Sequence, residues 1–145
     1  MSSRTINPAL EEQLIDSLTA TLLPGVVSVY LFGSRAAGRA HAESDVDVAV
    51  LLHRTEFPTE RDRFEARLFL TAEMIARLRL NAVDLVVLND VPPLFARRVV
   101  TEGHRVFCAD AEADVAFTRD TLLRAADLAP WVERMAALKL EALRR

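Results

Sequence analysis

Three short runs of β-branched and aliphatic residues most constrain what this chain can fold into. They occupy residues 26–32, 46–52 and 83–88, and the first and third are closed by Gly33 and by Asn89-Asp90. Runs of this length and composition are typical of buried strands. A short polar, glycine-bearing segment joins the first two runs, and apolar residues at helical spacing precede the first run and separate the second from the third. The pattern therefore predicts a mixture of strands and helices.

Two helices are predicted around the first strands. Asn7-Pro8 predicts the start of a helix that Pro24-Gly25 ends. Thr59 predicts the N-cap of a long helix that runs to about Leu80. Its apolar face is expected to carry Phe64, Leu68, Ile75 and Leu78. Its arginines interleave with acids and are expected on a solvated face: Arg61, Arg63, Arg67, Arg77 and Arg79.

The last third of the chain reads as helix, strand and helix. Pro92 predicts a short helix that Gly103 ends, and residues 105–108 predict an edge strand. From Asp110 the helical pattern continues to the end of the sequence, with a break or kink expected at Pro130.

Composition bounds the classes of protein that fit. With 145 residues, 51% of them apolar and 27% charged, the chain is expected to form one α+β domain with a mixed sheet. The domain is expected to span residues 1–145, with a core over about 8–108 and a helical tail over about 110–145. One cysteine allows no internal disulfide, and a net charge of −3 argues against direct nucleic-acid binding. With no signal peptide and no apolar run long enough to span a bilayer, a cytoplasmic protein without membrane contact is expected.

Asp45 and Asp47 give the first chemical signal, because aspartate is a poor strand residue and only Val46 separates the two. Alternate residues of a strand face the same side, so both carboxylates are expected to project together. Unpaired carboxylates at that distance repel each other, and a hard divalent cation removes the repulsion. The pair therefore predicts a metal site on the second strand.

Asp84, near the start of the third predicted strand, supplies a third carboxylate. If that strand lies beside the second, Asp84 stands across from the aspartate pair. Three carboxylates around one or two Mg²⁺ ions are an arrangement for phosphoryl or nucleotidyl transfer. Asp84 would then either bind the metal or take the proton of the attacking hydroxyl.

Gly33-Ser34, at the end of the first predicted strand, predicts the phosphate-binding part of the site. Glycine lets the backbone approach a phosphate closely, and the serine hydroxyl can donate to it. The residues after Ser34 are expected to begin a helical turn, whose free N–H groups favour an anion. Arg35 and Arg39 are candidate phosphate partners.

The spacing of these residues resembles a known signature. Gly33-Ser34, ten residues and then Asp45-Val46-Asp47 are similar to the signature of the polymerase-β-like nucleotidyltransferase superfamily. In its small size and in the motif Gly-Ser-Arg-Ala-x-Gly, the chain resembles the minimal nucleotidyltransferases (MNT). The likeness covers about residues 10–108. Many members carry arginine where Ala37 stands, which leaves the role of a second arginine to Arg39 or to no residue.

The resemblance implies a polymerase-β-like nucleotidyltransferase fold and an antitoxin activity. Such MNT proteins transfer AMP from ATP to a tyrosine hydroxyl of a partner HEPN-domain toxin. Carried over by position, the implied metal ligands are Asp45, Asp47 and Asp84. Gly33 and Ser34, together with Arg35, would hold the nucleotide. ATP as the substrate and Mg²⁺ as the cofactor follow from the resemblance, since the sequence shows no base-specific pocket.

Two other functions stay open. A degenerate member could act as a non-catalytic antitoxin that only covers the toxin, although the presence of all three acids favours an enzyme. A small-molecule, aminoglycoside-type transferase would normally bring a further substrate-binding domain, and only about 35 residues follow Cys108. The apolar residues of the tail, Trp131 and Leu138 among them, are expected to help dock the protein partner; otherwise they pack on the domain.

Overall fold

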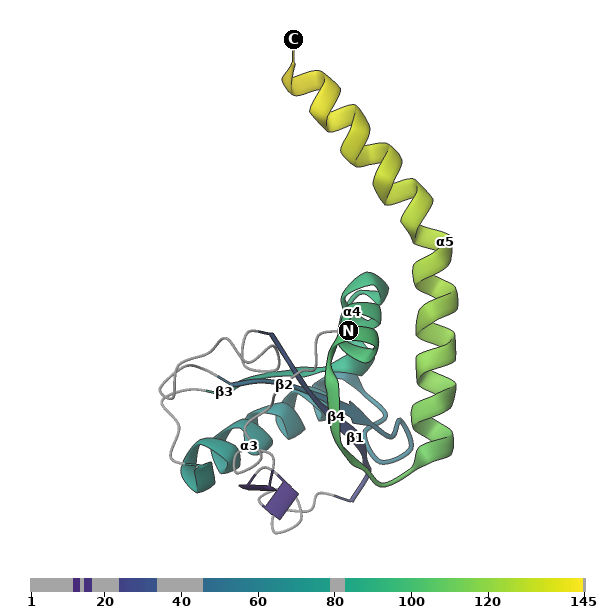
Figure 1. Cartoon of the computed structure of the whole chain (residues 1–145). Helices are drawn as coiled ribbons and strands as arrows, with labels where there is room; N and C mark the ends of the chain where they lie inside the picture. Colours follow the sequence, from purple (N-terminus) through teal and green to yellow (C-terminus); the bar gives the residue numbers. More distant parts are fainter. Residues whose placement is uncertain (1–11, 14, 17–23, 34–45, 79–82, 145) are drawn as a thin grey trace.

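A computed structural model describes residues 12–13, 15–16, 24–33, 46–78 and 83–144 of the chain. Four strands form one sheet in the order β3-β2-β1-β4 (Figure 1). β1 pairs antiparallel with β2 and β4, while β2 and β3 run parallel, so the sheet is mixed as predicted. Most of the expected N-terminal helix lies outside the described residues. The strands are β1 (Val26–Phe32), β2 (Val46–Leu52), β3 (Val83–Val87) and β4 (His104–Cys108).

Helix α3 (Glu60–Leu78) connects β2 to β3 and covers one face of the sheet. A reciprocal capping pair starts it: the Asp62 backbone N–H donates to the Thr59 hydroxyl at 3.0 Å, and the Thr59 N–H donates to the Asp62 carboxylate at 3.3 Å. This confirms the predicted cap. Alternate strand residues pack beneath α3, among them Val29, Leu31, Val48, Val50 and Leu85.

The buried face of α3 differs from the predicted one. Ala66, Leu70 and Met74 pack on the sheet, whereas Phe64 and Leu68 are more than half exposed. Both sets repeat at three- and four-residue spacing, so periodicity alone does not separate them. Small Ala66 lets the helix approach the sheet closely, which turns the two larger side chains outward. Ile75 of the predicted face does pack against this core.

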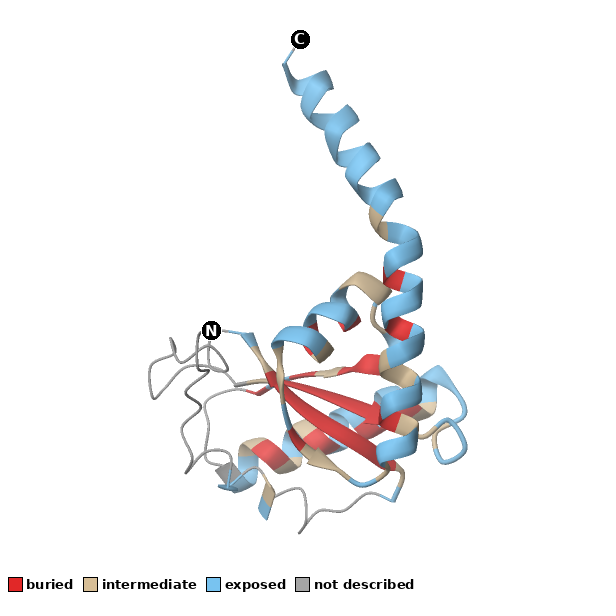
Figure 2. Cartoon of the chain, turned by 45° about the vertical axis from the view of Figure 1, so that its right-hand side comes forward, coloured by how far each residue is buried: buried red, intermediate tan, exposed pale blue. Residues whose placement is uncertain are grey.

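The other face of the sheet is covered by α4 (Pro93–Glu102) and by the beginning of α5 (Ala111–Leu143). Its core contains Tyr30, Leu51 and Val99. A short 3₁₀ turn, η1 (Leu88–Asp90), leads from β3 toward α4. The predicted short helix after Pro92 and the edge strand are thus confirmed, and Figure 2 shows the buried strands between the helices.

Helix α5 begins at a side-chain cap and continues through Pro130. The Asp110 carboxylate accepts the Ala113 N–H at 3.1 Å, which satisfies one free donor of the first turn. The proline does not break the helix. Figure 1 shows the ribbon changing direction along its length, as a helix with an internal proline does. Residues 130–144 are all exposed, so the distal part of α5 projects from the domain (Figure 2).

Within the described ranges, no helix is both long enough and apolar enough to cross a membrane.

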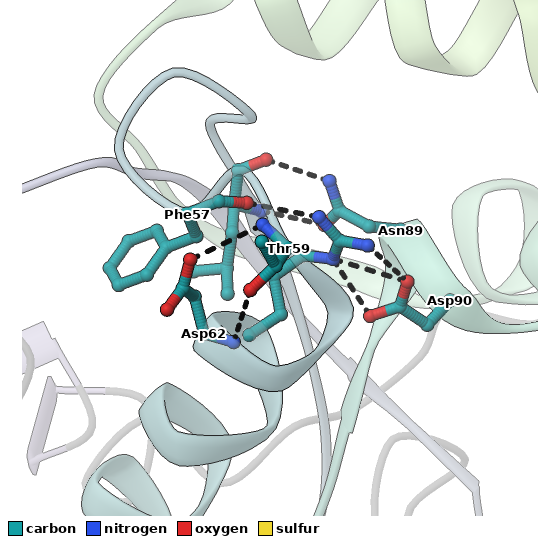
Figure 3. A network of polar contacts seen from close by, with 7 residues as sticks. Phe57, Thr59, Asp62, Asn89 and Asp90 are labelled. Carbon is teal, nitrogen blue, oxygen red and sulfur yellow. Dashed lines mark hydrogen bonds and ion pairs between the residues drawn. The ribbon is translucent and has the colours of Figure 1, made fainter.

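Arg63 corrects the expectation of a solvated arginine face, because it is only 5% exposed. Its guanidinium donates to both carboxylate oxygens of Asp90 at 2.9–3.1 Å and to the Phe57 carbonyl at 2.9 Å (Figure 3). Beside it, the Asn89 amide exchanges two hydrogen bonds with the backbone of Leu52. This network joins the start of α3 to the end of β2, whereas the predicted site lies at the start of β2.

Candidate active site

The parallel pairing of β2 and β3 brings two of the predicted acids together. Asp47 and Asp84 are direct partners in the register. Asp47 alternates with Ala49 and Asp84 with Val86, so both carboxylates belong to the face that α4 covers. Asp84 is exposed and Asp47 is half-buried, which leaves this pair open to a ligand at the end of the sheet. The prediction that Asp84 stands across from the second strand is confirmed.

Gly33, at the end of β1, adjoins Asp47. Its φ is +79°, and a Cβ placed there would overlap the Asp47 carboxylate, whose Cγ would lie at only 2.9 Å. Glycine is therefore required both by its backbone conformation and by the lack of space. The carboxylate of Asp47 lies directly over a stretch of backbone that carries no side chain.

The chemistry of these groups fits a hard divalent cation. Two carboxylates on adjacent strands offer oxygen donors, which are the ligands that Mg²⁺ prefers. Four of the predicted site residues lie outside the described part of the chain: Ser34, Arg35, Arg39 and Asp45. Their roles in the site therefore stay predictions. Across the residues that are described, no group of three acidic, histidine or cysteine side chains is close enough to hold a metal.

An aromatic pair stands beside the acids, and sequence reasoning missed it. Phe32 is the register partner of Asp47, and its ring contacts Phe95 of α4 edge-to-face, with centroids 5.7 Å apart and planes at 87°. Phe95 is 38% exposed, so the pair gives this end of the sheet a partly open apolar wall. No signal near Phe95 in the sequence indicates this contact, because it depends on how α4 crosses the sheet.

A buried carboxylate lies under the start of α5, and the sequence did not single it out either. Asp114 is 3% exposed. One of its oxygens accepts from the Ser28 hydroxyl at 2.6 Å and the Tyr30 hydroxyl at 2.8 Å, and the other accepts from Arg105 at 2.8 Å. Burial and the neighbouring carboxylate raise the pKa of Tyr30 to about 12. The hydrogen bond to Asp114 raises the pKa of Arg105.

This network forms one end of a cleft of about 620 Å³ between α4 and α5. Apolar side chains of the two helices, including Val100, Leu122 and Leu123, line much of the rest of the cleft, together with Thr118 and Arg119. None of the predicted site residues that the structure describes lines it. The network ties α5 to β1 and β4, and we assign it a structural role rather than a part in the chemistry.

Comparison with known proteins gives a consistent result. The family model described as Polymerase beta, Nucleotidyltransferase matches residues 12–112, which include all four strands and the predicted acids. A protein adenylyltransferase MntA from Shewanella oneidensis is 32% identical over 98 residues. The match covers 68% of this chain and 66% of that relative, just under two thirds of its length.

Solved structures extend the likeness to the whole fold. A chain of a toxin–antitoxin crystal structure with AMP-PNP superposes with a TM-score of 0.68 at 29% identity, covering 89% of this chain and 95% of that chain. A chain of the MntA–HepT toxin–antitoxin crystal structure matches with a TM-score of 0.64 at 26% identity, over 92% and 97% of the two chains. A chain from the structure of a tri-AMPylated Shewanella oneidensis HEPN toxin in complex with an MNT antitoxin matches with a TM-score of 0.60 at 26% identity, over 89% and 92% of the two chains.

Proposed function

Because this chain belongs to the Polymerase beta nucleotidyltransferase family, we propose that it is a protein adenylyltransferase that acts as an antitoxin. It would transfer AMP from ATP to a hydroxyl of a partner HEPN toxin, with tyrosine as the expected acceptor. The observation that carries this proposal is the pairing of Asp47 with Asp84 beside Gly33, which puts two carboxylates and an open backbone at one end of the sheet.

The relatives support both the reaction and the partner. One is named a protein adenylyltransferase, one was crystallised with the ATP analogue AMP-PNP, and one complex holds a tri-AMPylated HEPN toxin. ATP as the substrate and a HEPN toxin as the partner follow from these similarities. Together with the single cysteine of the chain, they favour a cytoplasmic location.

Asp47 and Asp84 would hold the metal, with Asp45 as the third ligand that the signature assigns. A bound Mg²⁺ would neutralise phosphate charge and keep the attacking and leaving oxygens in line. In the reaction, the acceptor oxygen forms a bond to the α-phosphorus of ATP, pyrophosphate leaves, and the hydroxyl proton passes to a base. Exposed Asp84 is the described carboxylate best placed to receive a proton from an incoming protein.

The phosphate-binding residues complete the proposal. Gly33 has no Cβ, so the Asp47 carboxylate lies against the backbone at the end of β1, and a metal-bound triphosphate held by Asp47 would come close to that backbone. Ser34 would donate its hydroxyl, and Arg35 would pair with phosphate oxygens. Both assignments come from the position of these residues in the signature.

Transfer of label separates the possible reactions. The chain is incubated with its cognate HEPN protein, Mg²⁺ and ATP labelled at either the α- or the γ-phosphate. We expect label on the HEPN protein from α-labelled ATP alone, because AMP retains only the α-phosphate. Replacing the acceptor tyrosine of the toxin by phenylalanine should abolish the label.

Matched variants of the chain show whether the acids are responsible. Asp47→Asn and Asp84→Asn should each abolish labelling, whereas Asp120→Asn on the exposed face of α5 should not. If the toxin binds and is neutralised without label, the chain is a non-catalytic antitoxin. If an aminoglycoside is labelled in place of the protein, the substrate assignment is wrong.

A further inference from the structure

The face of α5 that packs on the domain continues beyond the point where the domain ends. Asp114, Thr121 and Ala125 are the buried residues of this helix. Three- and four-residue steps from Ala125 along the same face lead to Leu128, Val132 and Met135. The contact stripe of the helix therefore runs past the last residue that the domain covers.

The stripe becomes more apolar where its cover is lost. Its buried members are an aspartate, a threonine and an alanine, whereas Leu128, Val132 and Met135 are large and are 38%, 38% and 47% exposed. Trp131 and Leu138 beside them are 58% and 54% exposed. A contiguous apolar surface of this kind on a small protein marks an interaction site. Within the described part of the chain, Figure 2 shows no element next to this part of the helix.

The width of the apolar face indicates the shape of its partner. Two helices that pair as a coiled coil use a narrow seam flanked by charged residues. On α5 the flanking positions are Ala129, Trp131, Ala136 and Leu138, and Arg134 and Glu141 lie on the opposite side. The one charge on the face itself is Lys139, one turn beyond Met135. A face this wide requires cover on both sides of its midline, as in the helix-in-groove mode of recognition.

We propose that Leu128–Leu143 of α5, the distal segment, docks into an apolar groove between helices of the toxin partner. This inference rests on the proposed function, since that function supplies the partner. Relatives from toxin–antitoxin crystal structures match this chain over 89–92% of its length, so the likeness extends past the middle of α5. The alternative partner is a second copy of this chain. A pair of helices would leave the apolar residues beside the seam uncovered, so it would cover this face less completely than a groove does.

Docking on this segment would also orient the partner toward the acids. The distal segment continues, through the bend, a helix that Asp110 caps and that Asp114 fastens to Tyr30 of β1 and Arg105 of β4. A toxin held by the distal segment is thus connected to the sheet that carries Asp47 and Asp84. The segment would deliver the acceptor hydroxyl and not merely raise affinity.

The test compares two double variants of the full chain. Trp131→Ala with Leu138→Ala removes two large side chains of the apolar face, and Arg134→Ala with Glu141→Ala trims the opposite face of the same segment. Binding of each protein to the cognate HEPN toxin is measured by calorimetry, and self-association is measured by sedimentation equilibrium. We expect the first variant to bind the toxin at least about 30-fold more weakly and the second to match wild type. Both should keep the rise in melting temperature that Mg²⁺–ATP causes.

Undiminished toxin binding by the apolar-face variant overturns the proposal. Lost self-association with unchanged toxin binding also overturns it, by assigning the face to a second copy. If the variant fails to fold, the wild-type chain labelled with 5-fluorotryptophan gives the answer, because Trp131 is its single tryptophan. A fluorine shift on toxin binding supports docking, and an unchanged signal overturns it.

The same samples separate this inference from the proposed function. A complex that forms through the distal segment but transfers no AMP overturns the proposed reaction and leaves docking supported. Transfer that persists at wild-type rate in the apolar-face variant overturns docking and leaves the reaction supported. If the wild-type chain does not bind the toxin at all, both the proposed function and the docking proposal are overturned.

Discussion

Asp47 of β2 and Asp84 of β3 are direct partners across a parallel strand pair, although all of α3 separates them in the sequence. Their side chains share one face of the sheet, and the Asp47 carboxylate lies directly over the backbone of Gly33. Two carboxylates this close repel each other unless a cation or a proton intervenes. Under the proposed function, a metal bound at the start of β2 would relieve this repulsion.

The first prediction concerns the effect of the acids on ligand-dependent stability. Mg²⁺ with a non-hydrolysable ATP analogue should raise the melting temperature of the wild-type chain, because a ligand that binds only the folded state stabilises it. Asp47→Asn with Asp84→Asn should abolish that rise, because both carboxylates that would hold the metal are removed. Scanning fluorimetry measures both effects, and Asp120→Asn is the control. A double variant that still gains stability from the metal and nucleotide would exclude this pair as the metal site.

The second prediction compares two glycines that both adopt a positive φ. Gly33→Ala and Gly25→Ala should each destabilise the fold by about 1–2 kcal/mol, because alanine is strained in this conformation. A Cβ at Gly25 would meet Glu56 at 2.6 Å, far from the acids, whereas a Cβ at Gly33 would collide with Asp47. Only Gly33→Ala should therefore weaken nucleotide binding, as measured by titration. Equal losses of affinity in the two variants would show that the effect is a general one on stability.

The third prediction concerns the ion pair at the opposite end of β2. Arg63→Met should lower the free energy of unfolding by about 3–5 kcal/mol, because it leaves the partly buried Asp90 carboxylate and the Phe57 carbonyl without their donor. Arg61→Met, which removes an exposed partner of Glu65, should cost at most about 0.5 kcal/mol. Urea unfolding measures both. A cost for Arg63→Met as small as that of the control would mean that the network contributes little.

The fourth prediction is a dependence of stability on pH that arises from Tyr30. Burial raises its pKa from 10.0 to about 12 in the folded state, so the fold favours the neutral phenol. The resulting stabilisation is complete below pH 10.0 and is lost as the pH rises toward about 12, because the unfolded chain releases this proton first. Tyr30 is the single tyrosine, so ultraviolet absorbance follows it directly.

The same titration tests the cause of the shift. Asp114→Asn removes the charge that opposes ionisation of the phenol but leaves it buried, so the pKa of Tyr30 should fall part of the way toward its ordinary value. A folded wild-type protein that titrates at the ordinary value would contradict the buried hydrogen bond.

Much of the sheet could be predicted from the sequence because its strands are short apolar runs with clear ends. The bounds of β1 and β2 match the prediction, and the position of Asp84 opposite Asp47 followed from placing the third strand beside the second. Alternation along a strand is a local property, so it identifies which residues share a face. The part of the site that depends on strand order could therefore be predicted from the sequence.

Features that depend on distant partners were not predicted. Arg63 has the same sequence surroundings as its solvated neighbours, and only the approach of Asp90 and the Phe57 carbonyl explains its burial. In the sequence, Asp114 looks like any acid in the first turn of a helix. Only the folded chain brings Ser28, Tyr30 and Arg105 around its carboxylate. At Pro130 the sequence left open whether the helix breaks or kinks. Because the missing N–H removes a single hydrogen bond, the exposed helix can continue through a bend.

The projecting half of α5 also determines how the free protein moves in solution. A helix of 33 residues is about 50 Å long, and its distal half extends beyond a small domain (Figure 1). A 16.1 kDa particle with such an arm experiences more friction than a sphere of equal mass. It will diffuse slowly and elute early from a sizing column, where a monomer would be mistaken for a larger species. A partner that docks along the distal half of α5 would fill space that the projecting helix already sweeps out. Binding would then add mass to the particle with little increase in its hydrodynamic radius.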